Sequence, residues 1–399
     1  MMAPRRAAGI GASPAFRAGM RTAVLGLSTA LGLVGAAWAG AAIRVARLVV
    51  TPAARRADTR ILAIDAAAQT ITLSRTDDTV LPGRYGLFTR GSEDYIKLGS
   101  VLSEDAVSVT RKLLTHVGAR SRLAPEAAFS GWYYDRPEQL QLPYTSELVP
   151  SAVGPCPAWV FPGTSDTWCI QVHGRGTTRA ECLRAVPLLH SLGFTTMLVS
   201  YRNDGEAPRS KHGTYGLGAT EWRDVDAAIG FARRAGAKRI LLMGWSMGGA
   251  ISLQLALRSA HRDRIAGIIL DSPVVDWRVV LDYQAHGMGL PAPVTKLALE
   301  TLGTGWGTAF TRAGAPIPFD ALDVVARADE LRVPVLIMHS DDDGFVPSDA
   351  SHALAQARPD LVQLEVFDTA RHTKLWNYDQ NRWNDTIRGW LERTSIRAS

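Results

Sequence analysis

From about residue 146 to its end, the chain alternates short apolar runs with stretches of helical periodicity. The apolar runs lie at residues 168–172, 196–200, 240–243, 265–270, 333–338 and 362–367. Most of them are continuously apolar, as expected of parallel strands that are covered on both faces. Strands that alternate with helices in this way form a doubly wound sheet. The pattern therefore predicts an α/β domain with a mostly parallel sheet over residues 146–399.

The strongest chemical signal is a G-x-S-x-G pentapeptide at residues 244–248, with Ser246 at its centre. An apolar strand runs into it, and a helix-forming stretch at residues 250–260 follows it. In this context the pentapeptide predicts a sharp strand-to-helix turn that exposes the serine oxygen as a nucleophile. The glycines fit such a turn because they have no Cβ to collide with the neighbouring backbone. The alternative is an ordinary glycine-rich turn.

A serine hydroxyl needs a histidine to take its proton and a carboxylate to orient that histidine. The base is expected after the last strand of such a sheet, where His372 lies five residues beyond the apolar run 362–367. Asp343 follows the preceding run and has the spacing D-x-x-V-P, which favours it as the acid. Asp271, at the end of the run before that, is the alternative acid.

The reaction also needs hydrogen-bond donors for the oxyanion of its transition state. We expect one to be the backbone N–H of Met247, directly after the serine. The other is expected to be the backbone N–H of Arg175, in the H-G-x-G loop at residues 173–176. The side chain of Arg175 is expected to form a structural salt bridge, with an anionic substrate as the alternative.

Together these motifs resemble the α/β-hydrolase family over residues 150–395. The elements H-G-x-G, G-x-S-M-G-G, D-x-x-V-P and a late histidine followed by Trp376 occur in the order found in that family. Two positions depart from its pattern. Ser340 replaces a glycine that is common after the strand histidine, and Arg175 is bulky for an oxyanion loop.

The resemblance implies a serine hydrolase with Ser246, Asp343 and His372 as its catalytic triad and with no metal or organic cofactor. The expected reaction is cleavage of a carboxylic ester through an acyl-enzyme. A serine peptidase and a thioesterase use the same fold and stay open as alternatives. A binding module with a silent triad is a further alternative. The resemblance also implies that the insertion at residues 274–332 is a helical cap over the active site, although it could be a structural elaboration.

Ahead of this domain, residues 48–115 contain short alternating segments separated by Gly, Ser and Asp turns. This pattern predicts a small antiparallel β module. The module is too short for a propeller, whose blades alone take about 40 residues each. Residues 116–145 are predicted to be a linker because they carry Pro125, Pro137 and Pro143.

The N-terminus, residues 1–47, is basic and contains an uncharged run at residues 22–43. That run is long enough to span a bilayer as a helix. It predicts either an uncleaved membrane anchor or a signal peptide, for which residues 37–39 (Ala-Trp-Ala) would be the cleavage site. The anchor is favoured because the run is longer than the apolar core, or h-region, of a usual signal peptide. In either case we expect the catalytic domain outside the cytoplasm, although the positive-inside rule does not decide the orientation.

The charge is concentrated in the same segment. Residues 1–60 carry a formal charge of +8. Because the formal net charge of the whole chain is +6, the rest of the chain carries −2. A nucleic-acid groove would need basic residues on the folded domain itself, and this class of partner is therefore excluded. The three cysteines, Cys156, Cys169 and Cys182, match no zinc motif. Cys156 and Cys169 could pair, but buried thiols are favoured. The sequence does not indicate an oligomeric state.

Overall fold

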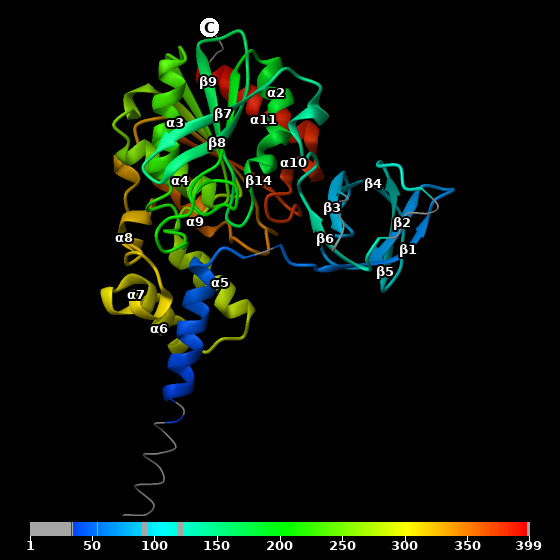
Figure 1. The fold of residues 1–399 in the computed structure, drawn as a ribbon, viewed down its shortest axis with the longest axis horizontal. Helices are drawn as coiled ribbons and strands as arrows, with labels where there is room; N and C mark the ends of the chain where they lie inside the picture. Colours follow the sequence, from blue (N-terminus) through cyan, green and yellow to red (C-terminus); the bar gives the residue numbers. More distant parts are fainter. Residues whose placement is uncertain (1–32, 34, 54, 90–94, 119–122, 397–399) are drawn as a thin grey trace, which may run out of the picture.

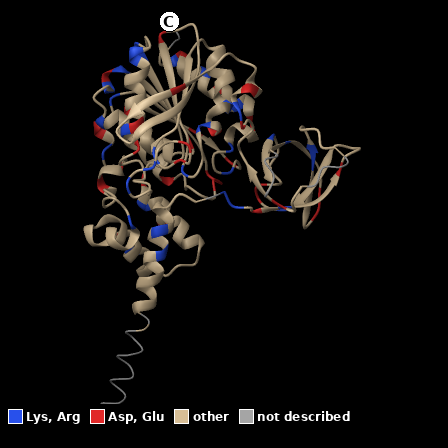
Figure 2. Ribbon diagram, viewed as in Figure 1, with Lys and Arg blue, Asp and Glu red and all other residues tan. Residues whose placement is uncertain are grey.

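The computed structural model describes residues 33, 35–53, 55–89, 95–118 and 123–396. Figure 1 shows three parts: a large α/β body, a small barrel of strands at its side, and an N-terminal helix that projects from the body beside helices α5, α6 and α7. Acidic and basic residues are interspersed along the ribbon of the helices around the sheet (Figure 2).

The α/β body contains an eight-stranded sheet with the order β14-β13-β12-β11-β9-β10-β8-β7. Its strands are β7 (Thr145–Ser151), β8 (Gly154–Phe161), β9 (Thr167–Val172), β10 (Thr195–Val199), β11 (Arg239–Trp245), β12 (Ile265–Asp271), β13 (Val335–Ser340) and β14 (Val362–Phe367). The six apolar runs are the strands β9 to β14, which pair in parallel. The predicted mostly parallel sheet is confirmed. Strands β7 and β8 were not predicted, and they form an antiparallel hairpin at one edge of the sheet.

Helices cover both faces of this sheet. They include α2 (Val186–Ser191), α3 (Trp222–Arg234), α4 (Met247–Arg258), α9 (Asp349–Ala357), α10 (Leu375–Tyr378) and α11 (Gln380–Arg393). Successive side chains of a strand point to opposite faces. On β11, Leu242 therefore joins the cluster under α3 and α4, whereas Leu241 joins the cluster under α2 and α11.

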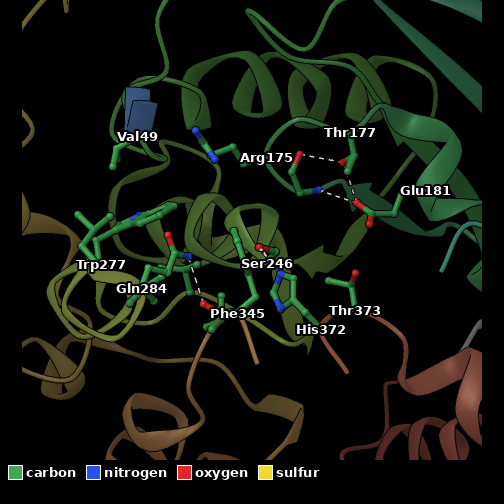
Figure 3. A pocket seen from close by; sticks show the side chains of 15 residues that line it. Val49, Arg175, Thr177, Glu181, Ser246, Trp277, Gln284, Phe345, His372 and Thr373 are labelled. Carbon is green, nitrogen blue, oxygen red and sulfur yellow. Dashed lines mark hydrogen bonds between the residues drawn. The ribbon is translucent and has the colours of Figure 1, made fainter. Parts of the chain in front are cut away.

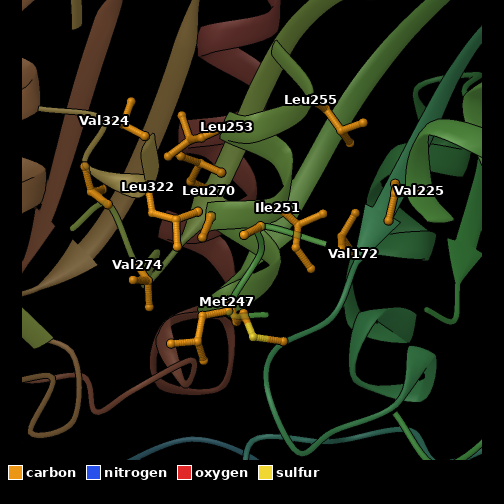
Figure 4. Close-up of a cluster of buried hydrophobic side chains, with 14 of the residues drawn as sticks. Val172, Val225, Met247, Ile251, Leu253, Leu255, Leu270, Val274, Leu322 and Val324 are labelled. Carbon is orange, nitrogen blue, oxygen red and sulfur yellow. The ribbon is translucent and has the colours of Figure 1, made fainter. Parts of the chain in front are cut away.

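The core around α4 fixes the base of the turn that carries Ser246. Ile251 and Leu255 of α4 are fully buried and pack with Val172 and Leu270 of the strands (Figure 4). Each such side chain contributes roughly 1.5–3 kcal/mol by leaving water. A well-packed helix directly after Ser246 gives the serine a rigid support.

The insertion at residues 274–332 is helical, as predicted. It contains α5 (Trp277–Gly287), α6 (Ala292–Gly303), α7 (Gly305–Thr311) and α8 (Phe319–Leu322). Of these helices, α5, α6 and α8 share the hydrophobic core of the catalytic domain through Val280, Val294 and Leu322. The insertion is therefore packed onto the domain and is not a separate body.

The N-terminal β module is a closed barrel with the strand order β1-β2-β5-β4-β3-β6. Its strands are β1 (Thr59–Asp65), β2 (Thr70–Ser74), β3 (Tyr85–Thr89), β4 (Tyr95–Glu104), β5 (Ser108–Leu113) and β6 (Glu126–Ser130). The predicted boundary was wrong here, because β6 lies within the expected linker 116–145. The strand pairs with β1 and β3 and closes the barrel. Its five residues include two alanines, so it carries little strand signal of its own.

The predicted boundary at residue 47 also moves, because residues 35–50 are helical and the first strand begins at Thr59. Ala42, Ala46 and Val50 are buried at a spacing of four residues, so one face of this helix docks on the catalytic domain. Most of the apolar run expected to be an anchor or signal segment lies outside the described residues. Within the part that is described, no helix is both long and apolar enough to cross a bilayer.

Candidate active site

Ser246 lies at the turn between β11 and α4 in a strained backbone conformation, with φ 51° and ψ −118°. A Cβ on Gly244 would lie 2.4 Å from the carbonyl oxygen of Gly248, and one on Gly248 would lie 2.1 Å from that of Val172. Both positions therefore require glycine. The strain is held by the surrounding fold, since the Ser246 amide donates to the carbonyl oxygen of Asp271 at 3.1 Å.

The side chains of Ser246, His372 and Asp343 lie in a hydrogen-bonded row. His372 Nε2 is 3.0 Å from Ser246 Oγ, and His372 Nδ1 is 2.8 Å from Asp343 Oδ2. His372 comes from the loop after β14, and Asp343 comes from the loop after β13. The backbone amide of His372 also donates to the carbonyl oxygen of Asp343 at 3.0 Å, which ties the two loops together. The fold thus brings the three predicted side chains into contact.

Asp343 is buried and its carboxylate is held from several sides. Its Oδ1 accepts hydrogen bonds from the amides of Phe345 and Val346, at 3.0 and 2.6 Å. Burial by itself raises the pKa of Asp343, but the charges and hydrogen bonds of His372 and His339 outweigh it and hold the pKa well below its usual range. Asp343 is therefore ionised near neutral pH and favours a proton on Nδ1 of His372.

Asp271, the alternative acid, points elsewhere. It is fully buried at the end of β12, and its Oδ2 accepts a hydrogen bond from Trp383 Nε1 at 2.9 Å. Burial raises its pKa to about 6, even though Arg184 and the hydrogen bond from Trp383 lower it. The structure thus gives Asp343 the contact with His372 and gives Asp271 a contact in the core behind the site.

Replacing Asp271 with asparagine is expected to change the pH dependence of stability. Because its pKa rises from 3.8 to about 6 on folding, the folded protein keeps this proton to higher pH than the unfolded chain. Asp271 thus favours the folded state most at low pH. That contribution, up to about 3 kcal/mol, is lost as the pH rises from about 4 through 6. Urea unfolding at about pH 4.5 and pH 8 should show the variant gaining stability relative to wild type at the higher pH. An equal difference at both pH values would contradict this assignment.

The two expected oxyanion donors come from different elements of the fold. Met247 is the first residue of α4, where backbone amides have no acceptor within the helix. Arg175 lies in the loop after β9. The amide of its neighbour Gly174 is already engaged, since it donates to Glu181 Oε2 at 2.9 Å. The amide of Gly176 likewise donates to the hydroxyl of Tyr215 at 3.4 Å, which leaves the amide of Arg175 as the one to consider for the substrate.

The side chain of Arg175 does not form the expected salt bridge with any residue that the structure describes. Its guanidinium donates to the carbonyl oxygens of Leu48 and Thr51, at the end of the N-terminal helix. A positive charge at this position also suits the negative end of the helix dipole. Arg175 therefore joins the oxyanion loop to the N-terminal helix.

Contacts that the sequence does not reveal hold the oxyanion loop in place. His173 is buried, stacks on Tyr201 with ring centres 4.2 Å apart, and contacts Asp204 at 3.2 Å. The hydroxyl of Tyr201 donates to the carbonyl oxygens of His173 and Gly174. Tyr201 and Asp204 follow a different strand from the loop, so no local motif points to this contact.

A mainly apolar pocket opens at Ser246 and His372 (Figure 3), with a cavity volume of about 90 Å³. Its apolar walls come from Val49 of the N-terminal helix, from α5 and from the loop after β13, where the ring centre of Phe345 lies 5.1 Å from that of His372. The insertion thus forms one wall of the site. The α5 residues in this wall are Trp277, Val280, Leu281 and Gln284.

Cysteine thiols and clusters of metal ligands are the other groups that could support a reaction. Cys156, Cys169 and Cys182 are buried free thiols, as favoured by the sequence analysis. Among the residues that the structure describes, no group of three or more His, Cys, Asp or Glu side chains is placed to hold a metal ion.

Two family models match the chain. One, described as the alpha/beta hydrolase family, covers residues 172–383, which is more than half of the chain and includes all the side chains of the row. The other, described as a domain of unknown function (DUF8805), covers residues 60–130, which correspond to the barrel.

Several solved structures are similar to this chain. An esterase of Pyrococcus furiosus is 17% identical with a TM-score of 0.51, over 65% of this chain and 94% of that one. The same esterase in another crystal form is 19% identical with a TM-score of 0.50, over 65% and 93% of the two chains. A thermophilic esterase from Thermogutta terrifontis is 20% identical with a TM-score of 0.44, over 63% and 99%. At these identities the likeness concerns the fold.

Proposed function

Because the chain belongs to the alpha/beta hydrolase family, we propose that it is a serine hydrolase that cleaves a carboxylic ester through an acyl-enzyme intermediate. The observation that carries this proposal is the hydrogen-bonded row of Ser246, His372 and Asp343 at the mouth of an apolar pocket. Ester cleavage is chosen because similar solved structures are described as esterases.

In the proposed reaction, Ser246 Oγ attacks the ester carbonyl while His372 Nε2 takes its proton. Asp343 keeps the imidazole in the right tautomer and stabilises its charged form. The amides of Met247 and Arg175 bind the oxyanion. As the tetrahedral intermediate collapses, the bond to the alcohol oxygen breaks and His372 protonates the departing alcohol. Water then attacks the acyl group with His372 as base, which releases the acid and returns the proton to Ser246.

The same mechanism could cleave an ester, a peptide or a thioester, and parallel assays distinguish these substrate classes. We expect the purified protein to react with a fluorophosphonate and to hydrolyse p-nitrophenyl esters. The narrow apolar pocket favours short acyl chains over long ones in a panel of increasing chain length. Faster turnover of aminoacyl-nitroanilides would favour the peptidase, and faster turnover of acyl thioesters would favour the thioesterase. No reaction with the fluorophosphonate would point to a binding module.

Export of the catalytic domain, with or without an anchor, stays a prediction, and N-terminal sequencing of the protein from its producing cell tests it. Cleavage after Ala39 would leave the docked residues of the helix in place, because burial on this helix begins at Ala42. We expect either a chain that starts near Gly40 or an intact chain in the membrane fraction. An intact chain in the soluble cytosolic fraction would contradict both forms.

A further inference from the structure

Two charged residues beside His372 are held by the loop between β2 and β3 of the barrel. Lys374 Nζ lies 3.2 Å from Asp78 Oδ1, and the guanidinium of Arg371 lies within 3.9 Å of the same oxygen. Arg371 also reaches Asp77 of this loop at 4.0 Å. Because Arg371 and Lys374 stand on opposite sides of His372 in the sequence, the barrel contacts the histidine loop before and after the imidazole.

A second contact joins the end of the same barrel loop to α10. The amide nitrogen Nδ2 of Asn377 donates to the carbonyl oxygen of Arg84 at 2.7 Å, and the Arg84 amide donates back to the carbonyl oxygen of Asn377 at 3.2 Å. The two backbones approach so closely that a Cβ on Gly83 would lie 1.9 Å from the carbonyl oxygen of Asn377. The contact is therefore a tight fit that any side chain at position 83 would disrupt.

Arg184 connects Asn377 to Thr373, the residue that follows His372. Its Nη1 donates to Asn377 Oδ1 at 2.8 Å and to the carbonyl oxygen of Thr373 at 2.7 Å. Thr373 has a φ of 52°, and its amide donates to Ser272 Oγ at 3.1 Å. A threonine in this left-handed conformation persists only where its surroundings hold it, and here it is held on both sides. The position of His372 thus depends on a chain of contacts that begins in the barrel.

On the barrel side, the loop is fixed by a buried arginine. Arg111 is fully buried, and its guanidinium donates to the carbonyl oxygens of Thr79, Leu81 and Gly83. It also donates to the carbonyl oxygen of Gly99 on β4. The loop that contacts α10 is therefore a rigid part of the barrel, and it can hold the contacted residues of the catalytic domain in a fixed position.

We propose that the barrel is a positioning element of the active site, which acts through residues 77–84 to hold residues 371–377 so that His372 reaches both Ser246 and Asp343. This proposal rests on the proposed function, in which His372 is the base. Misplacement of a catalytic group by about 1 Å can lower the rate about 100-fold. Contacts that fix the position of this loop can therefore have a large effect on the rate. The barrel positions residues and does not itself take part in the chemistry.

Gly83→Ala tests the proposal, and Gly236→Ala is its matched control in the full chain. Both glycines have positive φ, 105° and 107°, so alanine strains the backbone similarly. Only at Gly83 does the new Cβ collide with the catalytic domain, since nothing lies within 4 Å of a Cβ at Gly236. With p-nitrophenyl acetate, we expect Gly83→Ala to lower kcat by about 100-fold with little change in KM. Gly236→Ala should keep the wild-type kcat.

Asp78→Asn is a milder variant in case Gly83→Ala does not fold. It keeps the shape of the side chain but removes the ion pairs to Lys374 and Arg371. We expect kcat to fall about threefold, as suits a partly exposed ion pair. Asp360→Asn, which removes an exposed ion pair with Arg358, is the control and should leave kcat unchanged. If both barrel variants keep the kcat of their controls, or raise KM alone, the positioning role is wrong.

A readout that does not depend on turnover separates this proposal from the proposed function. The proton on His372 Nδ1, hydrogen-bonded to Asp343, should give a low-field NMR signal that is missing in His372→Ala. We expect Gly83→Ala to shift or broaden this signal and Gly236→Ala to preserve it. A wild-type protein that hydrolyses no ester but shows this pattern would refute the proposed function and keep the positioning role. An unchanged signal in Gly83→Ala would overturn the positioning role even if the enzyme is active.

Discussion

Ser246→Ala is expected to abolish ester hydrolysis, with a loss of about a millionfold in kcat, because the members of a triad act as a unit. The structure gives a reason to expect an intact fold. The serine amide still donates to the carbonyl oxygen of Asp271, and Oγ makes its hydrogen bond to His372 alone among the described residues. The measurement is initial rates with p-nitrophenyl acetate, together with the melting temperature of both proteins.

Ser252→Ala is the matched control for this prediction. Ser252 is a buried serine on the same helix, but its hydroxyl donates to the carbonyl oxygen of Gly248 and lies away from the row of catalytic candidates. It should keep near wild-type kcat with a modest loss of stability, about 1 kcal/mol. Substantial turnover by purified Ser246→Ala would mean that another residue is the nucleophile.

Asp343→Asn is expected to lower kcat by about 10⁴-fold, with KM changed much less. The reason is the tautomer of His372. Asparagine can turn its NH₂ group toward Nδ1, which then accepts a hydrogen bond, so the proton moves to Nε2 and His372 can no longer accept the proton of Ser246. The amides of Phe345 and Val346 can still donate to the remaining oxygen, so the loop should keep its shape.

Asp271→Asn is the comparison that makes this result informative. Its remaining oxygen can still accept from Trp383 Nε1, and it makes no contact with His372 in the described structure. We expect kcat within about tenfold of wild type, because this carboxyl acts on the site only through the backbone and through its charge. If Asp271→Asn were the inactive variant and Asp343→Asn the active one, the acid would be Asp271.

The sequence alone was sufficient to predict that the candidate residues on single loops at the carboxyl edge of the sheet lie together. Ser246, Asp343 and His372 each follow a continuous apolar run, and the carboxyl ends of parallel strands meet at one edge. Once the runs were recognised as parallel strands, the loops that carry these residues had to be neighbours. The spacing of motifs along the chain therefore predicted which distant loops lie close together in the fold.

Other features left no local signal, because they depend on pairing between distant segments. Strand β6 is too short and too rich in alanine to stand out, yet it closes the barrel by pairing with β1 and β3. The N-terminal helix was expected to be an anchor or a signal segment, but its burial at every fourth residue from Ala42 places its end on the catalytic domain.

The contacts of the two candidate acids show most directly what only the tertiary structure reveals. Asp271 and Asp343 both end or follow a parallel strand, so the strand pattern leaves both at the same edge. What separates them is the direction of the side chain. Asp271 turns into the core toward Trp383, whereas Asp343 turns toward His372. That direction is set by packing and by hydrogen bonds from residues far away in the sequence, and the spacing of motifs along the chain does not encode it.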